Sequence, residues 1–380
     1  MIYFDNSATT PIYPQALESY VKVSQNYFGN PSSLHQLGET ASKLLNQARY
    51  QIAKIMGVMP SEIYFTSGGS EGDNWVIKGT ARAKSFYGKH LITSKIEHPA
   101  VMNTMKELED QGFEVTYLNV DQKGYIDLEE LKDALRPDTI LLSLIAVNNE
   151  MGVVQPIEAI SEILKDYPSV HFHLDAVQTV GQVDLHLGEE SRVDMAVFSG
   201  HKFHGPRGVG FVYVKSGKNL TPLVEGGGQE GNKRSGTENL PAIVAMAKAL
   251  RMVTDQAGQS QLPKLRDKLL KGLVKYPDID LFSPQEGAPH ILTFGIQNVR
   301  GEVTVHAFEE EDIYLSTTSA CSSRSNRESS TLLAMGVKPG HAQTAVRISL
   351  SFDNNLEEVD EFLRVLDKVY QQFEPVRQSK

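Results

Sequence analysis

The segment ILLSLIAVNNE, residues 140–150, joins an almost entirely apolar run at 140–145 to the polar residues Asn148, Asn149 and Glu150. A short apolar run that ends in polar residues is typical of a buried strand whose carboxyl end reaches the edge of a sheet. Similar runs lie at 63–65, 91–93, 115–118, 171–174 and 195–198, and predicted helices at 100–111, 128–135 and 157–167 alternate with them. This alternation predicts an α/β fold with a mostly parallel central sheet covered on both faces.

The pattern changes after a predicted helix at 240–256. Helices at 262–276 and 357–373, with short strands at 291–294 and 345–350, indicate a second, smaller α+β domain.

Composition narrows the class of protein. The 380 residues include 37 lysines and arginines against 47 aspartates and glutamates, a net charge of −10, and 40% are hydrophobic. These values are ordinary for a folded protein, and the acidic charge disfavours direct nucleic-acid binding because it repels phosphate backbones. No apolar run approaches the roughly 18 residues of a membrane helix, and no targeting segment is recognisable. We expect a cytoplasmic protein without membrane contact.

The polar residues that follow the apolar runs are candidates for a functional site, because ligands of parallel sheets bind beyond the carboxyl ends of the strands. These residues lie at 66–70, 97–98, 148–150, 175–178 and 199–202.

The segment TSGGSEGDN, residues 66–74, follows a predicted strand and opens a predicted helix. Its backbone N–H groups and the helix dipole would suit an anion such as a phosphate. The spacing matches neither the Walker pattern nor the dinucleotide fingerprint, and glycine turns with a serine cap also simply join strands to helices. Both interpretations stay open on these residues alone.

Asp175 and Lys202 follow two of the apolar runs. A carboxylate at the end of a buried strand needs a positive partner to stay ionised, and a protonated ring nitrogen would serve; the alternative is an aspartate that caps a following helix. Lys202 lies in FSGHKFHGPRGVG, where desolvation would lower its pKa and make it a Schiff-base nucleophile. The alternative is an ordinary solvated surface lysine.

Five histidines fall in or beside the candidate segments. His98, His201 and His204 are in the predicted loops, and each is either a hydrogen-bonded structural residue or a catalyst. His171 and His173 alternate on one strand, but no third or fourth ligand accompanies them. We therefore assign no metal and interpret this pair as packing residues.

Cys321 is the only cysteine, which excludes an internal disulfide and a multi-cysteine metal site. It lies in STTSACSSRSNRESS, residues 316–330, a segment dense in serine and threonine that predicts an exposed, mobile loop. Arg324 and Arg327 would favour the thiolate. A small buried hydrophobic residue is the alternative, which this polar segment disfavours.

Taken in order, these segments resemble the NifS/IscS cysteine desulfurases, pyridoxal-phosphate enzymes of the class V aminotransferase group. The similarity runs nearly end to end and rests on the motifs DNSATTP, FGNPSSLH, EIYFTSGGSEGDN, EHPAV, VNNEMGVVQPI, HLDAVQTVG, FSGHKFHGPRGVG, GGGQE, RSGTEN, SACSS and VRISL. The resemblance implies a fold type I enzyme that forms a homodimer. Residues 13–257 would form the large domain that binds pyridoxal 5′-phosphate, and residues 1–12 and 258–380 the small domain with the Cys321 loop.

The resemblance also implies roles for individual residues. Lys202 would bind the cofactor covalently and later move the substrate's Cα proton, while His98 would stack on the cofactor ring and assist. Asp175 would keep the pyridine nitrogen protonated, so that the ring accepts electrons. Asn149 and Arg347 would hold the substrate carboxylate. The remaining cofactor contacts would come from Gly69, Ser70, Gln178, Ser199, His201 and, from the other subunit, Thr237.

The implied reaction removes sulfur from L-cysteine and leaves L-alanine. Cys321 would take the sulfur as a persulfide and pass it to an acceptor protein, either an iron–sulfur scaffold or a tRNA-thiolating enzyme. Two alternatives remain: a related lyase or aminotransferase in which Cys321 is incidental, and a non-catalytic cofactor-binding scaffold.

The chain departs from the family pattern in several places. Ser70 replaces the usual threonine and keeps the hydroxyl, whereas Gly231 and Asn232 replace the usual Arg-Gly after GGGQE. Thr318 replaces a glycine, and Asn-Arg-Glu at 326–328 replaces Leu-Glu-Pro. These changes fall where an acceptor would dock, so the sequence leaves open the acceptor and the choice between cysteine and selenocysteine.

Overall fold

The structure, a computed structural model, describes residues 1–318 and 328–377. Its largest element is a seven-stranded sheet made of β2 (Ile63–Thr66), β3 (His90–Ser94), β4 (Glu114–Leu118), β5 (Thr139–Ile145), β6 (His171–Asp175), β7 (Met195–Ser199) and β8 (Gly210–Val214). The strand order is β2-β8-β7-β6-β5-β3-β4. The strands from β4 to β7 pair in parallel, and β8 is antiparallel to both of its neighbours. The expected α/β fold with a mostly parallel sheet is therefore confirmed.

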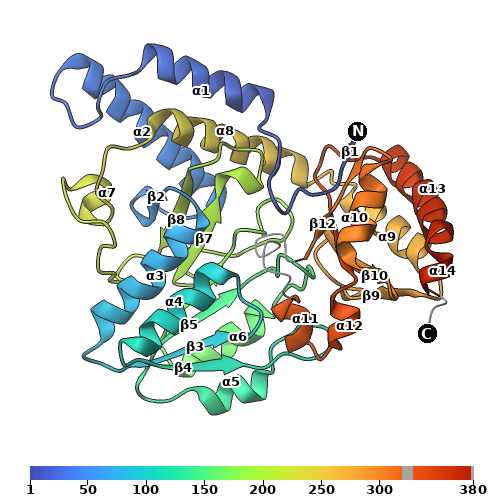
Figure 1. Ribbon diagram of the computed structural model, residues 1–380. Coiled ribbons are helices and arrows are strands. Elements are labelled where there is room, and N and C mark those ends of the chain that lie inside the picture. The colour runs from blue at the N-terminus through green and yellow to red at the C-terminus, as the bar shows by residue number, and fades with distance from the viewer. Residues whose placement is uncertain (319–327, 378–380) are drawn as a thin grey trace.

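Helices cover both faces of this sheet (Figure 1). On one face, α3 (Gly69–Lys84) packs Trp75 against Val197 of β7, and α4 (Pro99–Asp110) lies beside α3. On the other face, α5 (Leu128–Ala134), α6 (Ile157–Ile163) and α8 (Leu240–Ala257) cover the sheet, and α1 (Pro14–Asn26) and α2 (Gln36–Met56) pack on α8. Since side chains of a strand alternate between faces, His173 and Asp175 share the face that α3 covers.

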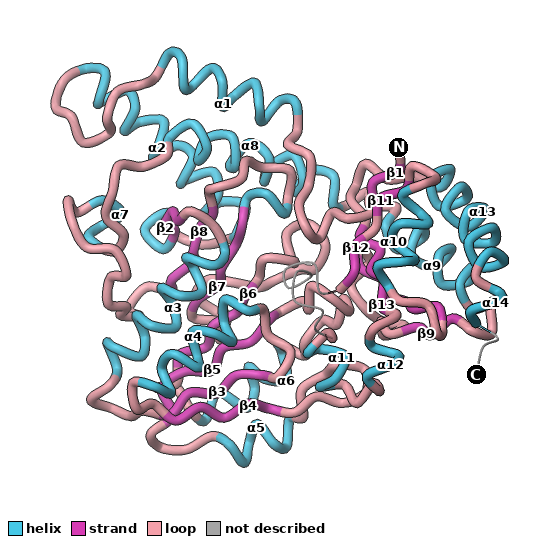
Figure 2. Tube along the Cα trace, in the orientation of Figure 1, coloured by secondary structure: helices cyan, strands magenta, loops and turns pink. Residues whose placement is uncertain are grey.

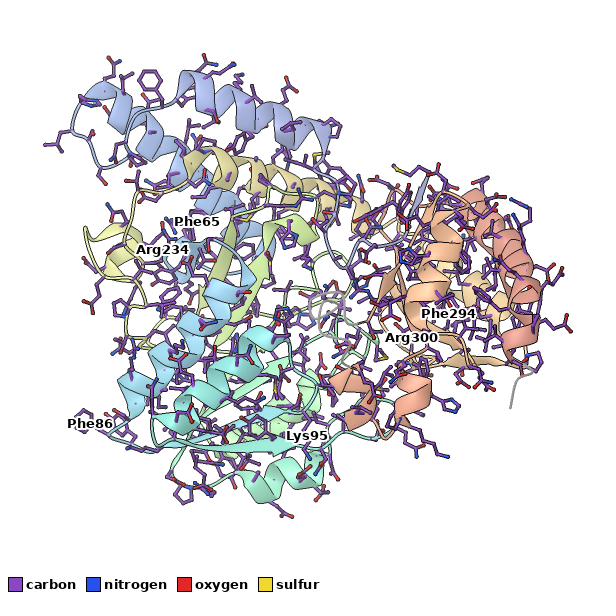
Figure 3. All side chains as sticks on the ribbon, viewed as in Figure 1. Phe65, Phe86, Lys95, Arg234, Phe294 and Arg300 are labelled. Carbon is purple, nitrogen blue, oxygen red and sulfur yellow. The ribbon has the colours of Figure 1, made fainter. Side chains whose placement is uncertain are left out.

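The later part of the chain forms an antiparallel sheet of β9 (Ile279–Leu281), β10 (Ile291–Ile296), β12 (Ser316–Thr317) and β13 (Ala345–Ser349). Its core lies around Phe294 and Phe362, with α9 (Leu262–Leu273), α10 (Gly301–Glu309) and α13 (Leu356–Gln372) packed against it. Phe294 and Phe65, labelled in Figure 3, lie in the parts of the molecule built on the small and the large sheet. The short helices α11 (Ser330–Ala334), α12 (Pro339–Ala342) and α14 (Glu374–Arg377) complete this part.

The amino terminus joins the small sheet's part of the molecule, as the chain trace in Figure 2 shows. Strand β1 (Ile2–Tyr3) pairs in parallel with β11 (Ile313–Tyr314). This pairing supports the division into residues 13–257 and residues 1–12 with 258–380, which remains a proposal. Within the described ranges, no helix is both long and apolar enough to cross a membrane.

Most expected elements are present with ends shifted by a few residues. The helix expected at 157–167 ends at Ile163 and continues as a 3-10 turn, and the helix expected at 262–276 ends at Leu273. Helices α1 and α2 and strand β8 were not expected from the sequence. Strand β8, GFVYV, directly follows the glycine-rich loop that had been interpreted only as a candidate site.

A buried ion pair holds the strand that leads into the glycine-rich turn. Glu230 in α7 (Gln229–Asn232) accepts two hydrogen bonds from the Arg49 guanidinium, at 2.6 and 2.8 Å, and one from the backbone N–H of Phe65 at 2.8 Å. Arg49 also donates to the carbonyl of Ile63. Because the Glu230 side chain is 1% exposed, its charge depends on Arg49 for compensation.

We expect Arg49→Ala to lower the free energy of unfolding by about 3–5 kcal/mol, because it leaves a buried carboxylate without its partner. Lys43→Ala is the matched control: it breaks the exposed Lys43–Glu39 pair, in which both side chains are more than half exposed, and should cost at most about 0.5 kcal/mol. Urea unfolding of both variants measures the difference. Equal effects of the two substitutions would contradict the importance of the Arg49–Glu230 pair.

Candidate active site

The carboxyl ends of neighbouring strands bring several predicted site residues together. Strand β6 ends at Asp175, and β7 ends at Ser199 and runs into a 3-10 turn, Gly200–Lys202. Strand β2 ends at Thr66, two residues before the turn that opens α3. The strand-end rule therefore identified the correct edge of the sheet for a cluster of polar groups.

Lys202 reaches the amino-terminal segment of the chain. Its Nζ donates to the carbonyl of Ser7 at 2.5 Å and to that of Ala8 at 3.0 Å. Ser7 is in turn held by a hydrogen bond from its N–H to Oγ of Ser349 on β13, at 2.8 Å. The lysine is partly buried and is thus not the solvated surface residue of the alternative interpretation.

Asp175 is 3% exposed, and its Oδ1 accepts a hydrogen bond from the N–H of Val177 at 3.0 Å. A turn follows it, so the alternative of a helix-capping aspartate is wrong. Burial raises the pKa of Asp175, while the charges of His98 and Lys202 and the Val177 N–H act in the opposite direction. A cation placed against this carboxyl would be strongly stabilised by it.

His98 begins α4 as its N-cap. Its Nδ1 accepts a hydrogen bond from the N–H of Ala100 at 3.1 Å, which fixes the orientation of the ring. A ring nitrogen or carboxyl oxygen of His98, Asp73 and Asp175 lies within 4.8 Å of the corresponding atoms of the other two. His98 thus lies beside Asp175, as predicted for a residue of the same site; the assignment of no metal remains a prediction.

The other two loop histidines have structural partners. Nδ1 of His201 lies 3.1 Å from Oγ1 of Thr9, and burial lowers the pKa of His201 to about 4. His204 stacks on Tyr13 with ring centroids 4.0 Å apart, and its Nδ1 lies 2.9 Å from the carbonyl of Pro11. His204 is therefore a packing residue of the amino-terminal segment.

The amino terminus of α3 forms a place for an anion. Gly68 has φ of 152°, and a Cβ added there would lie 3.6 Å from Oγ of Ser199. A Cβ on Gly69 would lie 2.8 Å from Cγ2 of Val177, closer than a side chain can come unless Val177 moves, whereas at Gly68 it is the positive φ that favours glycine. Ser70 is exposed in the first turn of this 16-residue helix. The backbone N–H groups at the start of α3 and the hydroxyls of Ser70 and Ser199 can together bind a phosphate.

Arg234 lies near the same turn and is labelled in Figure 3. Its guanidinium donates to both carboxylate oxygens of Glu71, at 2.8 and 3.2 Å, and Glu71 accepts a hydrogen bond from the N–H of Ser67. This cation stands two residues after the Gly231-Asn232 departure. Arg234 thus places a guanidinium at the turn, where its positive charge is paired with the Glu71 carboxylate.

Gln178 and Thr237 differ in their surroundings. Nε2 of Gln178, which is 8% exposed, donates to the carbonyl of Ser7 at 3.1 Å, and Gln178 and Lys202 line one pocket with Asn6 and Val177. Thr237 is exposed. Its position leaves the hydroxyl accessible, which is a requirement for the predicted contact with another subunit.

Arg347 lies on β13, facing the large sheet's edge from the other part of the molecule. Its guanidinium is 3% exposed and donates to the carbonyl of Asn149 at 2.8 Å and to Oδ1 of Asp5 at 3.0 Å. Its Nε has no hydrogen-bond partner among the described residues. The arrangement brings the two predicted carboxylate-binding residues, Asn149 and Arg347, into direct contact.

Sequence reasoning missed several residues of this region. Asp5 and Ser7 contact Arg347 and Lys202, although DNSATTP had been noted only as a motif. Glu97 was among the strand-end candidates and Asp73 lay in the segment at 66–74, but neither was given a role; both are buried carboxyls near Asp175. The predicted thiol, Cys321, lies outside the described residues. The described ends of the segment 316–330 are not exposed loop as expected: Ser316 in β12 and Ser329 at the start of α11 are buried.

The residues present fit pyridoxal 5′-phosphate. The cradle at α3 suits its phosphate, and the buried Asp175 carboxyl suits a protonated ring nitrogen. Lys202 lies at the neighbouring strand end, close enough for its charge to act against the raised pKa of the Asp175 carboxyl. The donor set thus matches the phosphate, the ring nitrogen and the aldehyde of this cofactor.

Comparisons with known proteins agree with this fit. The family model described as aminotransferase class-V matches residues 2–362. A protein named "NifS/IcsS protein homolog" from Lactobacillus delbrueckii subsp. bulgaricus is 53% identical over 99% of both chains, and a "Cysteine desulfurase IscS" from Methanosarcina thermophila is 43% identical over 97% of this chain and 92% of its own. A solved structure titled "NIFS-LIKE PROTEIN" has a TM-score of 0.91 at 40% identity, covering 98% of this chain and 99% of its own.

Dependence on pyridoxal phosphate is a general trait of the matched family, and the matched structure has the fold type I architecture. The family model and the relatives cover nearly the whole chain, including every described strand end that contributes to the site. We conclude that the chain belongs to the class-V aminotransferase family, within its NifS/IscS group.

Proposed function

We propose that this protein is a pyridoxal-phosphate-dependent cysteine desulfurase that converts L-cysteine to L-alanine and passes the sulfur to Cys321 as a persulfide. The observation that carries the proposal is the buried Asp175 carboxyl next to Lys202 and His98 at the end of β6. The name of the Methanosarcina thermophila relative, a cysteine desulfurase at 43% identity, supports the choice of reaction.

The cofactor, when bound, withdraws electrons from the substrate's Cα and so stabilises the carbanion formed there. Lys202 removes and returns the Cα proton through Nζ, and the carbonyls of Ser7 and Ala8 hold that amine close to the site when it is not bonded elsewhere. Asp175 keeps a ring nitrogen protonated by its charge. His98, oriented by the N–H of Ala100, assists the proton transfer.

The cofactor phosphate is assigned to Gly69, Ser70, Ser199 and His201, with Thr237 contributed by a second subunit. Gln178, anchored on the carbonyl of Ser7, is placed to bond a ring oxygen. Asn149 and Arg347 bind the substrate carboxylate, and the unpartnered Nε of the buried Arg347 guanidinium is a free donor for it among the described residues.

The sulfur transfer balances without an added oxidant or reductant. The Cys321 thiolate attacks the substrate sulfur, the Cβ–S bond breaks and an S–S bond forms. The electron pair of the broken bond stays on Cβ, which takes a proton and becomes the methyl group of alanine. Cysteine and the Cys321 thiol thus give alanine and a Cys321 persulfide, whose outer sulfur an acceptor's thiolate then removes.

The partner is a sulfur-acceptor protein, either an iron–sulfur cluster scaffold or a tRNA-thiolating enzyme. The net charge of −10 favours such a protein over direct contact with nucleic acid. We further propose a cytoplasmic homodimer. The exposed Thr237 fits a dimer in which it completes the partner's phosphate site.

A second candidate is a lyase or aminotransferase that uses the same site on another amino acid. The residues assigned above serve the cofactor and the substrate carboxylate, which other amino acids share, so the site would suit such a reaction as well. Release of alanine from cysteine separates the two. A non-catalytic scaffold would bind the cofactor and release neither alanine nor sulfide.

Lys202→Ala should abolish the absorbance of the lysine-bound cofactor and lower alanine formation by about 10²–10⁴-fold, because it removes both the covalent anchor and the proton carrier. Absorbance spectra of the variant with added cofactor test this. Lys165→Ala, at a lysine that is 65% exposed, is the control and should match the unmodified protein. An unchanged spectrum in Lys202→Ala would refute the lysine assignment.

Cys321→Ser should keep the cofactor absorbance and its change on addition of cysteine, but lose sulfide release by at least about 10²-fold, because a hydroxyl cannot accept the sulfur. Sulfide and alanine are measured with cysteine and a reductant. Since Cys321 is the only cysteine, no other thiol of the chain can replace it. Normal sulfide output from the variant would defeat the proposed role of the thiol.

A further inference from the structure

A group of buried polar side chains lies between α3 and β6, beneath the site described above. It consists of Asp73 on α3, His173 and Asp175 on β6, Ser143 on β5 and Glu97 in the loop after β3. Asp73 is 1% exposed, and His173 and Ser143 are fully buried. None of the roles proposed so far uses Asp73 or His173.

Asp73 and His173 face each other without a formed hydrogen bond. Oδ1 of Asp73 lies 3.5 Å from Nε2 of His173, and both atoms lack any other partner among the described residues. Buried polar atoms left without a hydrogen bond destabilise a folded protein. A single proton shared between the two atoms would form a hydrogen bond that satisfies both, once a small side-chain movement shortens their separation from 3.5 Å.

The charges around the two aspartates differ. Asp175 is influenced by His98, Lys202 and the Val177 N–H, which stabilise its ionised form. Burial and, after it, the carboxyls of Asp175 and Glu97 raise the pKa of Asp73 well above its ordinary value. Oxygens of the two carboxyls lie within 4.8 Å of each other, so ionisation of one opposes ionisation of the other.

His173 is neutral in this environment, because burial lowers its pKa to about 3. Its other nitrogen, Nδ1, lies 2.8 Å from Oγ of Ser143. The remaining titratable groups that face Asp73 are Glu97, whose pKa burial raises to about 8, and His98, within 4.8 Å. The groups around Asp73 are therefore the neutral His173 and the carboxyl of Asp175 on β6, and the carboxyl of Glu97 in the β3–α4 loop. His98, in the same loop, is the one described group there that could carry a positive charge.

We propose that Asp73 is an un-ionised carboxylic acid that donates its proton to Nε2 of His173, so that Asp175 carries the only negative charge of this pair of carboxyls. Asp73 is a positioning residue: it acts through His173 and Asp175. The protonation pattern is inferred from the buried Asp73–His173 contact and from the two buried carboxyls, Asp73 and Asp175, whose oxygens lie within 4.8 Å of each other. Its purpose, to leave one focused charge against the cofactor's ring nitrogen, rests on the proposed function.

The proposal fixes the tautomer of His173. If Asp73 donates to Nε2, the imidazole proton is on Nδ1, which donates to Oγ of Ser143. In the usual ionised Asp–His pair the proton would instead be on Nε2, and the Ser143 hydroxyl would donate to Nδ1. The two arrangements have the same heavy-atom positions and are distinguished only by locating the protons.

Nitrogen-15 NMR of histidine-labelled protein without cofactor tests the proposal at neutral pH. The His173 signals, identified by their loss in His173→Gln, should show a neutral ring protonated at Nδ1. Asp73→Asn should keep that tautomer, because its amide also donates to Nε2, whereas Asp73→Leu should not. A ring protonated at Nε2 or at both nitrogens would overturn the proposal.

A second measurement on the same sample does not depend on assigning His173. Asp73→Asn exchanges one neutral group for another, so the pH midpoint of the His98 signals should move by less than about 0.3 units. An ionised Asp73 within 4.8 Å of His98 would give a shift of about 1–3 units in this variant, which would overturn the proposal. Because both tests use the protein without cofactor, they are separate from the failure of the desulfurase assignment, which would appear as absent alanine release.

Discussion

The buried carboxylate of Asp175 is the constraint on which the rest of the site depends. A 3%-exposed negative charge at the end of β6 is stable only if cations and hydrogen-bond donors are arranged around it, and Lys202, His98 and the Val177 N–H meet that need. The same arrangement prepares the site for a ligand with a protonated ring nitrogen at one end. The α3 amino terminus, which favours an anion, lies at the other.

The amino-terminal segment connects this centre to the second sheet. The Ser7 carbonyl accepts hydrogen bonds from Lys202 and Gln178, and the N–H of Ser7 donates to Ser349 on β13. Asp5 pairs with Arg347 of the same strand. The first residues of the chain thus bond to groups from both sheets, so a shift of one sheet against the other would alter the surroundings of the lysine and of Arg347 together.

The sequence predicted the central sheet and the correct edge of it, because alternating apolar runs and strand-end polarity are local properties. It assigned Asp175, Lys202 and His98 to one site, and the structure brings them together. It could not assign Asp5 or Ser7, whose partners lie more than 190 residues away, nor Asp73, which looks like any polar residue of a helix until α3 is packed on β6. Strand β8 was missed because its neighbouring glycines were interpreted as loop.

The central claim is that the amine of Lys202 and the charge of Asp175 serve one bound pyridoxal phosphate. Borohydride reduction of the cofactor-loaded protein, followed by mass spectrometry of its peptides, tests this most directly because reduction makes the bond to the lysine permanent. We predict that the added mass is on Lys202, and that Asp175→Asn greatly weakens retention of the cofactor. Labelling at another lysine, or retention that is indifferent to Asp175, would contradict the account.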